Sequence, residues 1–139
     1  AYAGKADGKC NFIESTGVQD TDKIALAISF SSVGWLIQNS KLKSTASVSP
    51  TPSTIYDRLK GGAKMGYSEV YRNPYIYISY NVEDNTEIFL WYEDARSVND
   101  KLQLAKLFGI NGISFWRIGI IPNYTDDGLY YNVLESVRQ

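Results

Sequence analysis

The stretch LWYEDARS at residues 90–97, followed further along by ISFWR at residues 113–117, decides the fold. Ser97 can cap a helix, and Asp100 completes a Ser-x-x-Asp box that satisfies the first free N–H groups. Gly109 stands where a helix needs a left-handed residue to end. The apolar positions between them recur at helical spacing: Val98, Leu102, Ala105 and Phe108.

The mostly apolar run at residues 110–118 predicts a strand that follows this helix and is covered on both faces. The helix and the strand together predict half of a parallel β/α unit.

Composition bounds the class of protein. The chain has 139 residues, of which 44% are apolar, enough for one globular domain with a core. Its formal net charge of -1, without a basic cluster, argues against nucleic acid and anionic membrane surfaces as partners. No apolar run approaches the ~20 residues that a membrane-spanning helix needs.

Histidine is absent, and Cys10 is the single cysteine. These counts exclude a histidine-rich zinc site, a Ser-His-Asp triad and a Cys-His pair. The sequence has no glycine-rich phosphate loop and no cluster of metal ligands, so it implies no metal, nucleotide or flavin cofactor. Any chemistry must come from carboxylates, tyrosine, lysine or the substrate itself.

The aromatic content is a further signal. The chain has 11 Tyr and 3 Trp residues, spread along its length. Aromatic rings with polar tips suit sites that stack flat ligands and hydrogen-bond them, sugars included. The alternative is that these side chains only fill cores and hairpins, as most buried aromatic side chains do.

The first third of the chain contains one strand signal. Residues 1–22 are rich in small and polar residues and predict a loop or a frayed lead. Residues 23–30 form an apolar run of strand length, which predicts a strand buried on both faces. The residues from Ser31 to Trp35 break this run.

A surface excursion and a short helix are expected next. Residues 38–52 are polar and end in two prolines, which predicts a surface loop. Ser53 or Thr54 can cap a short helix that stops at the glycine pair 61–62.

A hairpin follows, in which residues 75–80 pair with residues 87–91 across a polar turn. Tyr75 and Tyr77 share one face of this hairpin, and the helix at residues 53–60 is expected to pack on one of its faces.

The last elements complete an α/β pattern. Asp126 or Asp127 can cap a final amphipathic helix, whose apolar positions are Leu129, Val133, Leu134 and Val137. The order strand, excursion, helix, strand and helix predicts an α/β fold with an α+β insertion. Two parallel strands cannot close a barrel or shield a sheet, so we expect a piece of something larger.

Four segments resemble glycoside hydrolase family 18, the chitinase-like (β/α)8 enzymes. Residues 22–35 resemble the seventh barrel strand, and Asn73-Pro74-Tyr75-Ile76 with the following hairpin resembles the insertion domain. Residues 91–102 resemble the return into the seventh helix, and residues 109–119 resemble the eighth strand. The resemblance is closest to the bacterial branch that acts on cell-wall and spore-wall glycans.

This resemblance implies the C-terminal portion of a TIM barrel, with strands 7 and 8 and their helices, plus the chitinase-type insertion. Residues 1–22 would be the lead, and residues 23–139 one domain. That domain would comprise a barrel strand at 23–35, the insertion at 36–91 and a helix-strand-helix unit at 92–139.

The resemblance also implies roles for four aromatic residues. Trp116 matches the tryptophan that floors the sugar site next to the scissile bond, at the C-terminal end of a barrel strand. Trp35, Tyr75 and Tyr77 could line the cleft wall that the insertion makes. For all four the alternative is packing alone.

No residue is assigned a catalytic role. Glu93 and Asp94 are adjacent on a strand, so their side chains point to opposite faces and cannot flank one glycosidic bond. We interpret Asp94 and Arg96 as a pair that fixes the turn.

The sequence departs from the family in ways that bear on catalysis. The proton donor of family 18 ends an Asp-x-x-Asp-x-Asp-x-Glu motif on the fourth strand, and this chain has no such run. The sixth-strand motif is also missing, unless residues 1–4 are its remnant. Ser31 and Ser32 stand where many relatives have tyrosine and glycine. We therefore predict no turnover by this chain alone.

Two hypotheses follow. The chain is the C-terminal part of a hydrolase of N-acetylglucosamine-containing polymers such as chitin or peptidoglycan, or it is a non-catalytic carbohydrate-binding or assembly module on a degenerate scaffold. A structural domain whose aromatic residues only pack is a third option. The resemblance implies an extracellular, cell-wall or spore location, and the open sheet edges predict self-association.

Overall fold

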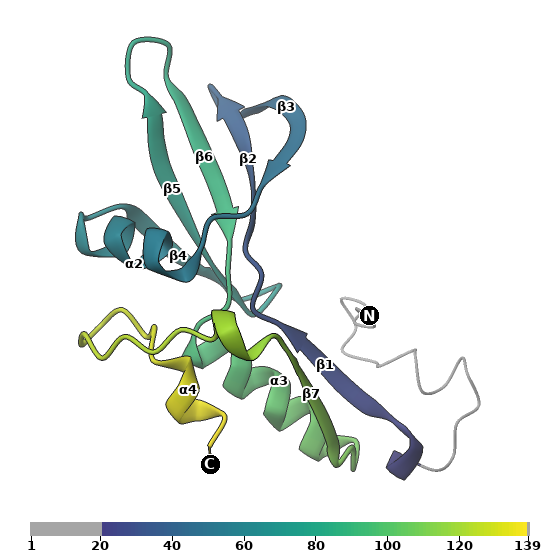
Figure 1. The fold of residues 1–139 in the computed structure, drawn as a ribbon. Coiled ribbons are helices and arrows are strands. Elements are labelled where there is room, and N and C mark those ends of the chain that lie inside the picture. Colours follow the sequence, from purple (N-terminus) through teal and green to yellow (C-terminus); the bar gives the residue numbers. More distant parts are fainter. Residues whose placement is uncertain (1–20, 139) are drawn as a thin grey trace.

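The computed structural model describes residues 21–138, so residues 1–20 of the expected lead lie outside the described part. Its elements are η1 (Thr21–Lys23), β1 (Ala25–Ser29), β2 (Val33–Gln38), β3 (Lys41–Val48), α2 (Pro52–Lys60), β4 (Lys64–Ser68), β5 (Asn73–Asn81), β6 (Thr86–Trp91), α3 (Ala95–Leu107), β7 (Gly112–Trp116), η2 (Ile118–Ile120) and α4 (Val133–Ser136). They form a two-stranded sheet, β1-β7, and a five-stranded sheet in the order β3-β2-β6-β5-β4. Figure 1 shows the five-stranded sheet above the two-stranded one.

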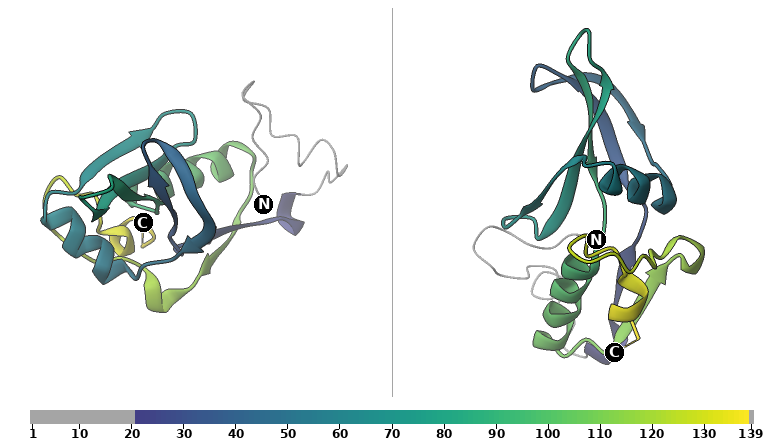
Figure 2. Two further views of the ribbon diagram at one scale, coloured as in Figure 1. Left: turned by 90° about the horizontal axis from the view of Figure 1, so that it is seen from above. Right: turned by 90° about the vertical axis from the view of Figure 1, so that its left-hand side faces the viewer.

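The two-stranded sheet is parallel, as the sequence predicts. Ala25 is paired with Gly112 at one end, and Ser29 with Trp116 at the other. Helices α3 and α4 cover one face, where the buried core consists of Ile28, Phe30, Val98 and Val133. Figure 2 shows α3 beside this pair and α2 beside the upper sheet.

The opposite face of the pair is uncovered. Its exposed side chains, which we call the bare face, are Ala25, Ala27, Ser29, Ser114 and Trp116. The prediction that both strands are buried on two faces was therefore wrong. Helices of the described chain pack against one face only, and the small residues of the other face gave an apolar signal without being buried.

Helix α3 begins one turn earlier than the sequence suggested. Its N-cap is Asp94, whose carboxylate accepts hydrogen bonds from the backbone N–H groups of Arg96 and Ser97, at 2.9 and 3.0 Å. Ser97 is the returning member of the capping box, because its hydroxyl accepts a bond from the N–H of Asp94. Asp100 is not part of the cap, so the predicted Ser97–Asp100 box was wrong. Gly109, with φ of 66°, does follow the helix as predicted.

The five-stranded sheet is antiparallel throughout and contains the predicted hairpin. Tyr75 is paired with Trp91, and Tyr77 with Phe89. The face that bears Ile76 packs against α2, as expected. Its buried core consists of Ile55, Leu59, Ile76, Ile78, Leu90, Tyr92 and Tyr131.

Three strands of this sheet, β2, β3 and β4, were not predicted. The segment 38–52, expected to be a surface loop, contains β3, which pairs with β2 across a two-residue turn. The turn residues Asn39 and Ser40 have φ of 49° and 61°, the left-handed pair that matches the twist of a tight hairpin. Strand β2 begins at Val33, inside the segment 31–35 that was expected only to break the preceding strand, and its partners are β3 and β6 rather than β1. Strand β4 pairs with β5 at the opposite edge.

The ends of two helices also differ from expectation. Helix α2 is capped by Thr51, with Pro52 in its first turn, rather than by Ser53 or Thr54. Helix α4 spans only Val133–Ser136, and its N-cap Asn132 makes no side-chain cap bond. Neither Asp126 nor Asp127 caps it, because the helix begins only at Val133, and the Asp126 carboxylate accepts a hydrogen bond from the Tyr56 hydroxyl instead.

Candidate functional site

Trp116 lies at the C-terminal end of β7 with its side chain on the bare face. It is 65% exposed, an unusual state for a tryptophan that ends a parallel strand. Its backbone carbonyl accepts a hydrogen bond from the Phe30 N–H at 2.8 Å, which ties the ends of the two strands together. Phe115 points to the opposite face and stacks on Phe30, with ring centroids 5.8 Å apart. The alternation of the strand therefore holds Trp116 outward.

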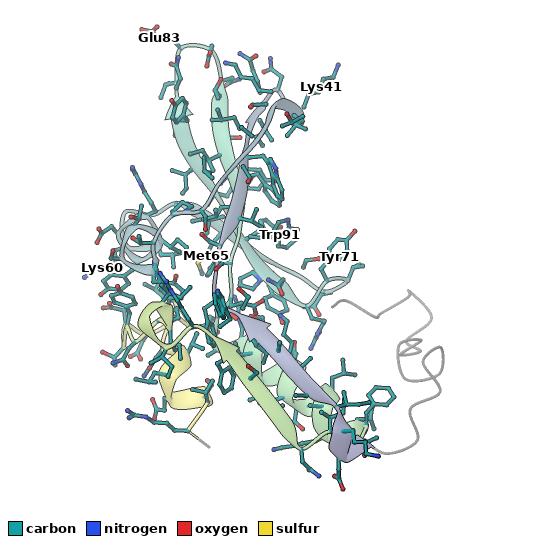
Figure 3. All side chains as sticks on the ribbon, turned by 45° about the vertical axis from the view of Figure 1, so that its right-hand side comes forward. Lys41, Lys60, Met65, Tyr71, Glu83 and Trp91 are labelled. Carbon is teal, nitrogen blue, oxygen red and sulfur yellow. The ribbon has the colours of Figure 1, made fainter. Side chains whose placement is uncertain are left out.

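A second group of aromatic side chains lies on the five-stranded sheet, on the face opposite α2. Register and alternation put five rings there, which we call the aromatic face: Trp35, Tyr75, Tyr77, Phe89 and Trp91. In Figure 3, Trp91 lies on the opposite side of the sheet from Lys60 of α2. All five side chains are partly exposed.

Ring contacts join the neighbours of this face. Tyr75 meets Tyr77, Phe89 and Trp91 with centroids 5.9, 5.6 and 5.5 Å apart. Phe89 lies between Tyr77 and Trp91, at 5.1 Å from each. The rings are mostly edge-on or tilted to each other, which is the favoured arrangement for aromatic pairs.

The structure thus brings together three of the four residues singled out from sequence, namely Trp35, Tyr75 and Tyr77. Trp116 lies on the other sheet, and within residues 21–138 no ring contact joins it to those three. Phe89 and Trp91 were not singled out. Glu87, Phe89 and Trp91 are alternate residues of a predicted strand, so they share one face of it, and pairing puts that face on the side of Tyr75 and Tyr77. This spacing could have identified Phe89 and Trp91 from the sequence.

A network of charged and polar side chains joins the two sheets where β6 leads into α3. Lys101 Nζ lies 2.9 and 2.8 Å from the two carboxylate oxygens of Glu93, and 2.8 Å from Asn73 Oδ1. The Ser97 hydroxyl donates to Glu93 at 2.6 Å. Asp94 is fully buried and forms a salt bridge with Arg96 at 2.6 Å. Both carboxylates are therefore engaged in structural contacts, and Asp94 and Arg96 do fix the turn.

Two aromatic rings lie against the Arg96 side chain of this network. The Arg96 guanidinium lies 4.5 Å from the ring of Tyr67 and 4.2 Å from that of Tyr130, a cation–π arrangement on two sides. The Tyr67 hydroxyl donates to Asp100 at 2.6 Å. Burial, together with this hydrogen bond, raises the pKa of Tyr67 above its ordinary value. Burial raises the pKa of Asp100, but hydrogen bonds from Tyr67 and Arg72 outweigh it and lower that pKa overall.

Two open depressions are present on the described surface. One, of about 340 Å³, lies on the aromatic face and is lined by Ile37, Ser40, Lys64, Tyr77, Glu87 and Phe89. The other, of about 400 Å³, lies between the start of α2 and the segment after η2, and it is lined by Thr51, Pro52, Ser53, Gly119, Ile120, Ile121, Asn123 and Tyr124.

Two kinds of feature are absent from the described part of the chain. Among residues 21–138, no group of three or more Cys, Asp or Glu side chains could hold a metal ion. No helix in the same range is both long and apolar enough to cross a membrane. The partly exposed rings of the aromatic face and the exposed ring of Trp116 suit the recognition of sugar rings.

Comparison with known proteins gives the family context. No family model matches the chain. A segment of 44 residues is 43% identical to the cortical fragment-lytic enzyme of Bacillus anthracis and covers 32% of this chain and 10% of that enzyme. A segment of 61 residues is 31% identical to the cortical fragment-lytic enzyme of Bacillus subtilis, covering 44% of this chain and 14% of that enzyme.

Solved structures extend the likeness to most of the chain. The spore cortex-lytic enzyme SleL of Bacillus cereus matches with a TM-score of 0.58 and 26% identity, over 76% of this chain and 24% of that one. The glycoside hydrolase family 18 N-acetylglucosaminidase of Paenibacillus barengoltzii matches with a TM-score of 0.58 and 18% identity, over 84% of this chain and 33% of that one. The resemblance to glycoside hydrolase family 18 is confirmed.

A chitinase of Trichuris suis is similar in fold, with a TM-score of 0.65 and 15% identity, over 88% of this chain and 37% of that one. The mixed α/β architecture seen here is thus chitinase-like. The chain spans about a tenth of the length of the first curated relatives it matches and about a quarter of SleL.

Proposed function

We propose that this chain is the C-terminal part of a family 18-like glycoside hydrolase that acts on N-acetylglucosamine-containing polysaccharide, such as chitin or peptidoglycan. The names of its relatives support this substrate class, because they include cortex-lytic enzymes and chitinases. Strands β1 and β7 would be the seventh and eighth strands of the barrel, with α3 between them. Residues 36–91 would form the insertion.

The exposure of Trp116 on the bare face is the observation that carries this proposal. Parallel sheets are normally covered on both faces, so the bare face suits the inside of a barrel whose other strands complete it. Trp116, at the C-terminal strand end where barrel enzymes do their chemistry, would floor the sugar site. Trp35, Tyr75 and Tyr77 would line the cleft wall.

The chain itself supplies no proton donor to this site. The Asp-x-x-Asp-x-Asp-x-Glu run is absent from its 139 residues, and the carboxylates of Glu93 and Asp94 are held in structural contacts. The donor would come from residues outside this sequence. By itself the chain would bind oligosaccharide without cleaving it, and the parent protein would be associated with a cell wall or spore.

The absence of that motif also keeps a second candidate open, a non-catalytic carbohydrate-binding or assembly module on a degenerate family 18 scaffold. The two candidates differ in the sequence of the full gene. A fourth-strand Asp-x-x-Asp-x-Asp-x-Glu motif upstream favours the hydrolase, and its absence favours the module.

Self-association follows from the same geometry. Strands β1 and β7 form a sheet of two in the described chain, so each has an open edge that can pair with another strand. We expect a dimer or a larger assembly in light scattering. A monodisperse monomer would contradict this part of the proposal.

A titration with oligomers of N-acetylglucosamine tests the binding function. Saturable quenching of tryptophan fluorescence without cleaved product is expected, and Trp116→Ala should abolish the part of the quenching that comes from the bare face. Trp91→Phe is the matched control, because it removes a tryptophan from the aromatic face and leaves Trp116 in place. Cleaved product would show that the chain holds a proton donor, and an unchanged titration of Trp116→Ala would overturn the assignment of the site floor.

A further inference from the structure

The depression on the aromatic face lies at the end of the five-stranded sheet farthest from the parallel pair. Along β6, the step from Trp91 to Glu87 is four residues, or roughly 13 Å at the rise of a strand. The lining of the depression includes Ser40 of the β2–β3 turn, which precedes Lys41, labelled in Figure 3. Trp116 is not among the lining residues, so this surface is separate from the bare face.

The floor of the depression includes two aromatic rings and one aliphatic side chain. Tyr77 and Phe89 face each other across β5 and β6 with ring centroids 5.1 Å apart, and Ile37 lies on the neighbouring strand. The faces of pyranose rings carry C–H groups that pack on aromatic rings. A volume of about 340 Å³ is at the small end of the range for ligand sites and suits one sugar ring.

The rim carries two charges of opposite sign. Lys64 Nζ lies 5.4 Å from the centroid of Tyr77, and the side chain of Glu87 is exposed at the other side of the floor. Within residues 21–138, no salt bridge engages Lys64 or Glu87. Lys43 of the same sheet is paired, with Asp84 at 2.8 Å. The rim therefore offers a charged donor and a charged acceptor that are not engaged in a salt bridge within the described part of the chain.

We propose that this depression binds one N-acetylated pyranose unit, at a site that shares Tyr77 with the proposed cleft wall but does not include Trp116. The acetamido group explains the pair of charges, because its N–H can donate to the Glu87 carboxylate while its carbonyl accepts from Lys64. Hydroxyl groups of the ring reach the Ser40 side chain, and the ring lies against Tyr77 and Phe89. The choice of an amino sugar rests on the proposed substrate class, whereas the site itself rests on the geometry.

Calorimetric titration with a trimer of N-acetylglucosamine tests this site, with a trimer of glucose as the matched ligand. We expect Glu87→Gln and Phe89→Ala to raise the dissociation constant at least fivefold, and the glucose trimer to bind at least fivefold more weakly. Met65→Ala is the control variant, because Met65 is an exposed side chain of β4 that is paired with Ile76 and so lies on the opposite face of the sheet. Its affinity should match that of the unchanged protein.

The outcomes separate this inference from the proposed function. Binding that survives Trp116→Ala and is weakened by Glu87→Gln supports the depression, even if the site floor at Trp116 fails. Glu87→Gln changes one exposed side chain and preserves its shape, so it stays informative if Phe89→Ala does not fold. The proposal is overturned if both variants bind within twofold of the unchanged protein, if Trp116→Ala removes all binding, or if the trimer does not bind.

Discussion

The two sheets of this molecule are built in opposite ways. The five-stranded sheet is made of neighbouring antiparallel strands and carries a helix from its own segment, so one face holds a core and the other an aromatic surface. The parallel pair joins strands that are far apart in the sequence, and its bare face has no cover within residues 21–138. The five-stranded sheet thus buries a core against its own helix α2, whereas the parallel pair leaves one face exposed to other residues or another molecule.

The largest effect should come from the core of the five-stranded sheet. Ile76 is fully buried between the sheet and α2. Ile76→Ala should lower the free energy of unfolding by about 2–5 kcal/mol, because it removes apolar contacts and leaves a cavity. Urea unfolding followed by circular dichroism measures this loss. Val82→Ala, at an 82% exposed position of the same hairpin, is the control and should change little.

The junction between the sheets should respond next. Asp94→Ala removes the N-cap of α3 and the salt bridge to Arg96. The loss of the cap alone costs about 1–2 kcal/mol. Asp94→Asn keeps a side-chain oxygen for the two N–H groups and should retain most of the stability. Equal losses for the two variants, in the same urea experiment, would show that the charge and not the cap holds the junction.

A third effect is confined to alkaline pH. Burial raises the pKa of Tyr92 and of Tyr131, both in the core of the five-stranded sheet, above the ordinary value of 10. The unfolded chain then loses these protons at lower pH than the folded chain does. Their contribution to stability is complete below about pH 10 and declines as the pH rises beyond it. A urea series at pH 8 to 12 should show this decline. Tyr131→Phe should make it shallower, and an unchanged slope would contradict this explanation.

The smallest effect should come from the bare face. Ser114 is exposed on β7, and within residues 21–138 its side chain makes no hydrogen bond. Ser114→Ala should change the free energy of unfolding by no more than about 0.5 kcal/mol. A loss of more than about 1 kcal/mol in the urea experiment would mean that this face is covered in solution, for example by a second copy of the chain.

Periodicity predicted the elements whose two faces differ. The helix at α3 and the hairpin of β5 and β6 each bury one side, so the apolar spacing was visible in the sequence. Strand β3 was missed because nearly all of its side chains are exposed, which leaves no alternation to detect. Its turn, Asn39-Ser40, was the only local sign of a hairpin.

On the bare face, the sequence predicted burial that the structure does not have. Ala25 and Ala27 read as members of a buried strand because they are apolar, yet they are exposed. Small apolar residues do not reveal whether another element covers them. For the candidate site, alternation placed Tyr75 and Tyr77 on one face. The place of Lys64 at the rim could not be predicted, because it depends on β4, whose pairing is long-range and carries no local signal.

The indole N–H signals of the three tryptophans offer the most direct test of the central claim, that Trp116 on the bare face contacts an N-acetylglucosamine chain. Proton–nitrogen NMR spectra recorded during titration with the oligomer report on Trp35, Trp91 and Trp116 at once, with each signal assigned by substitution. The account predicts a saturable shift of the Trp116 signal. A Trp116 signal that stays in place while the oligomer is bound elsewhere, or throughout the titration, would contradict it.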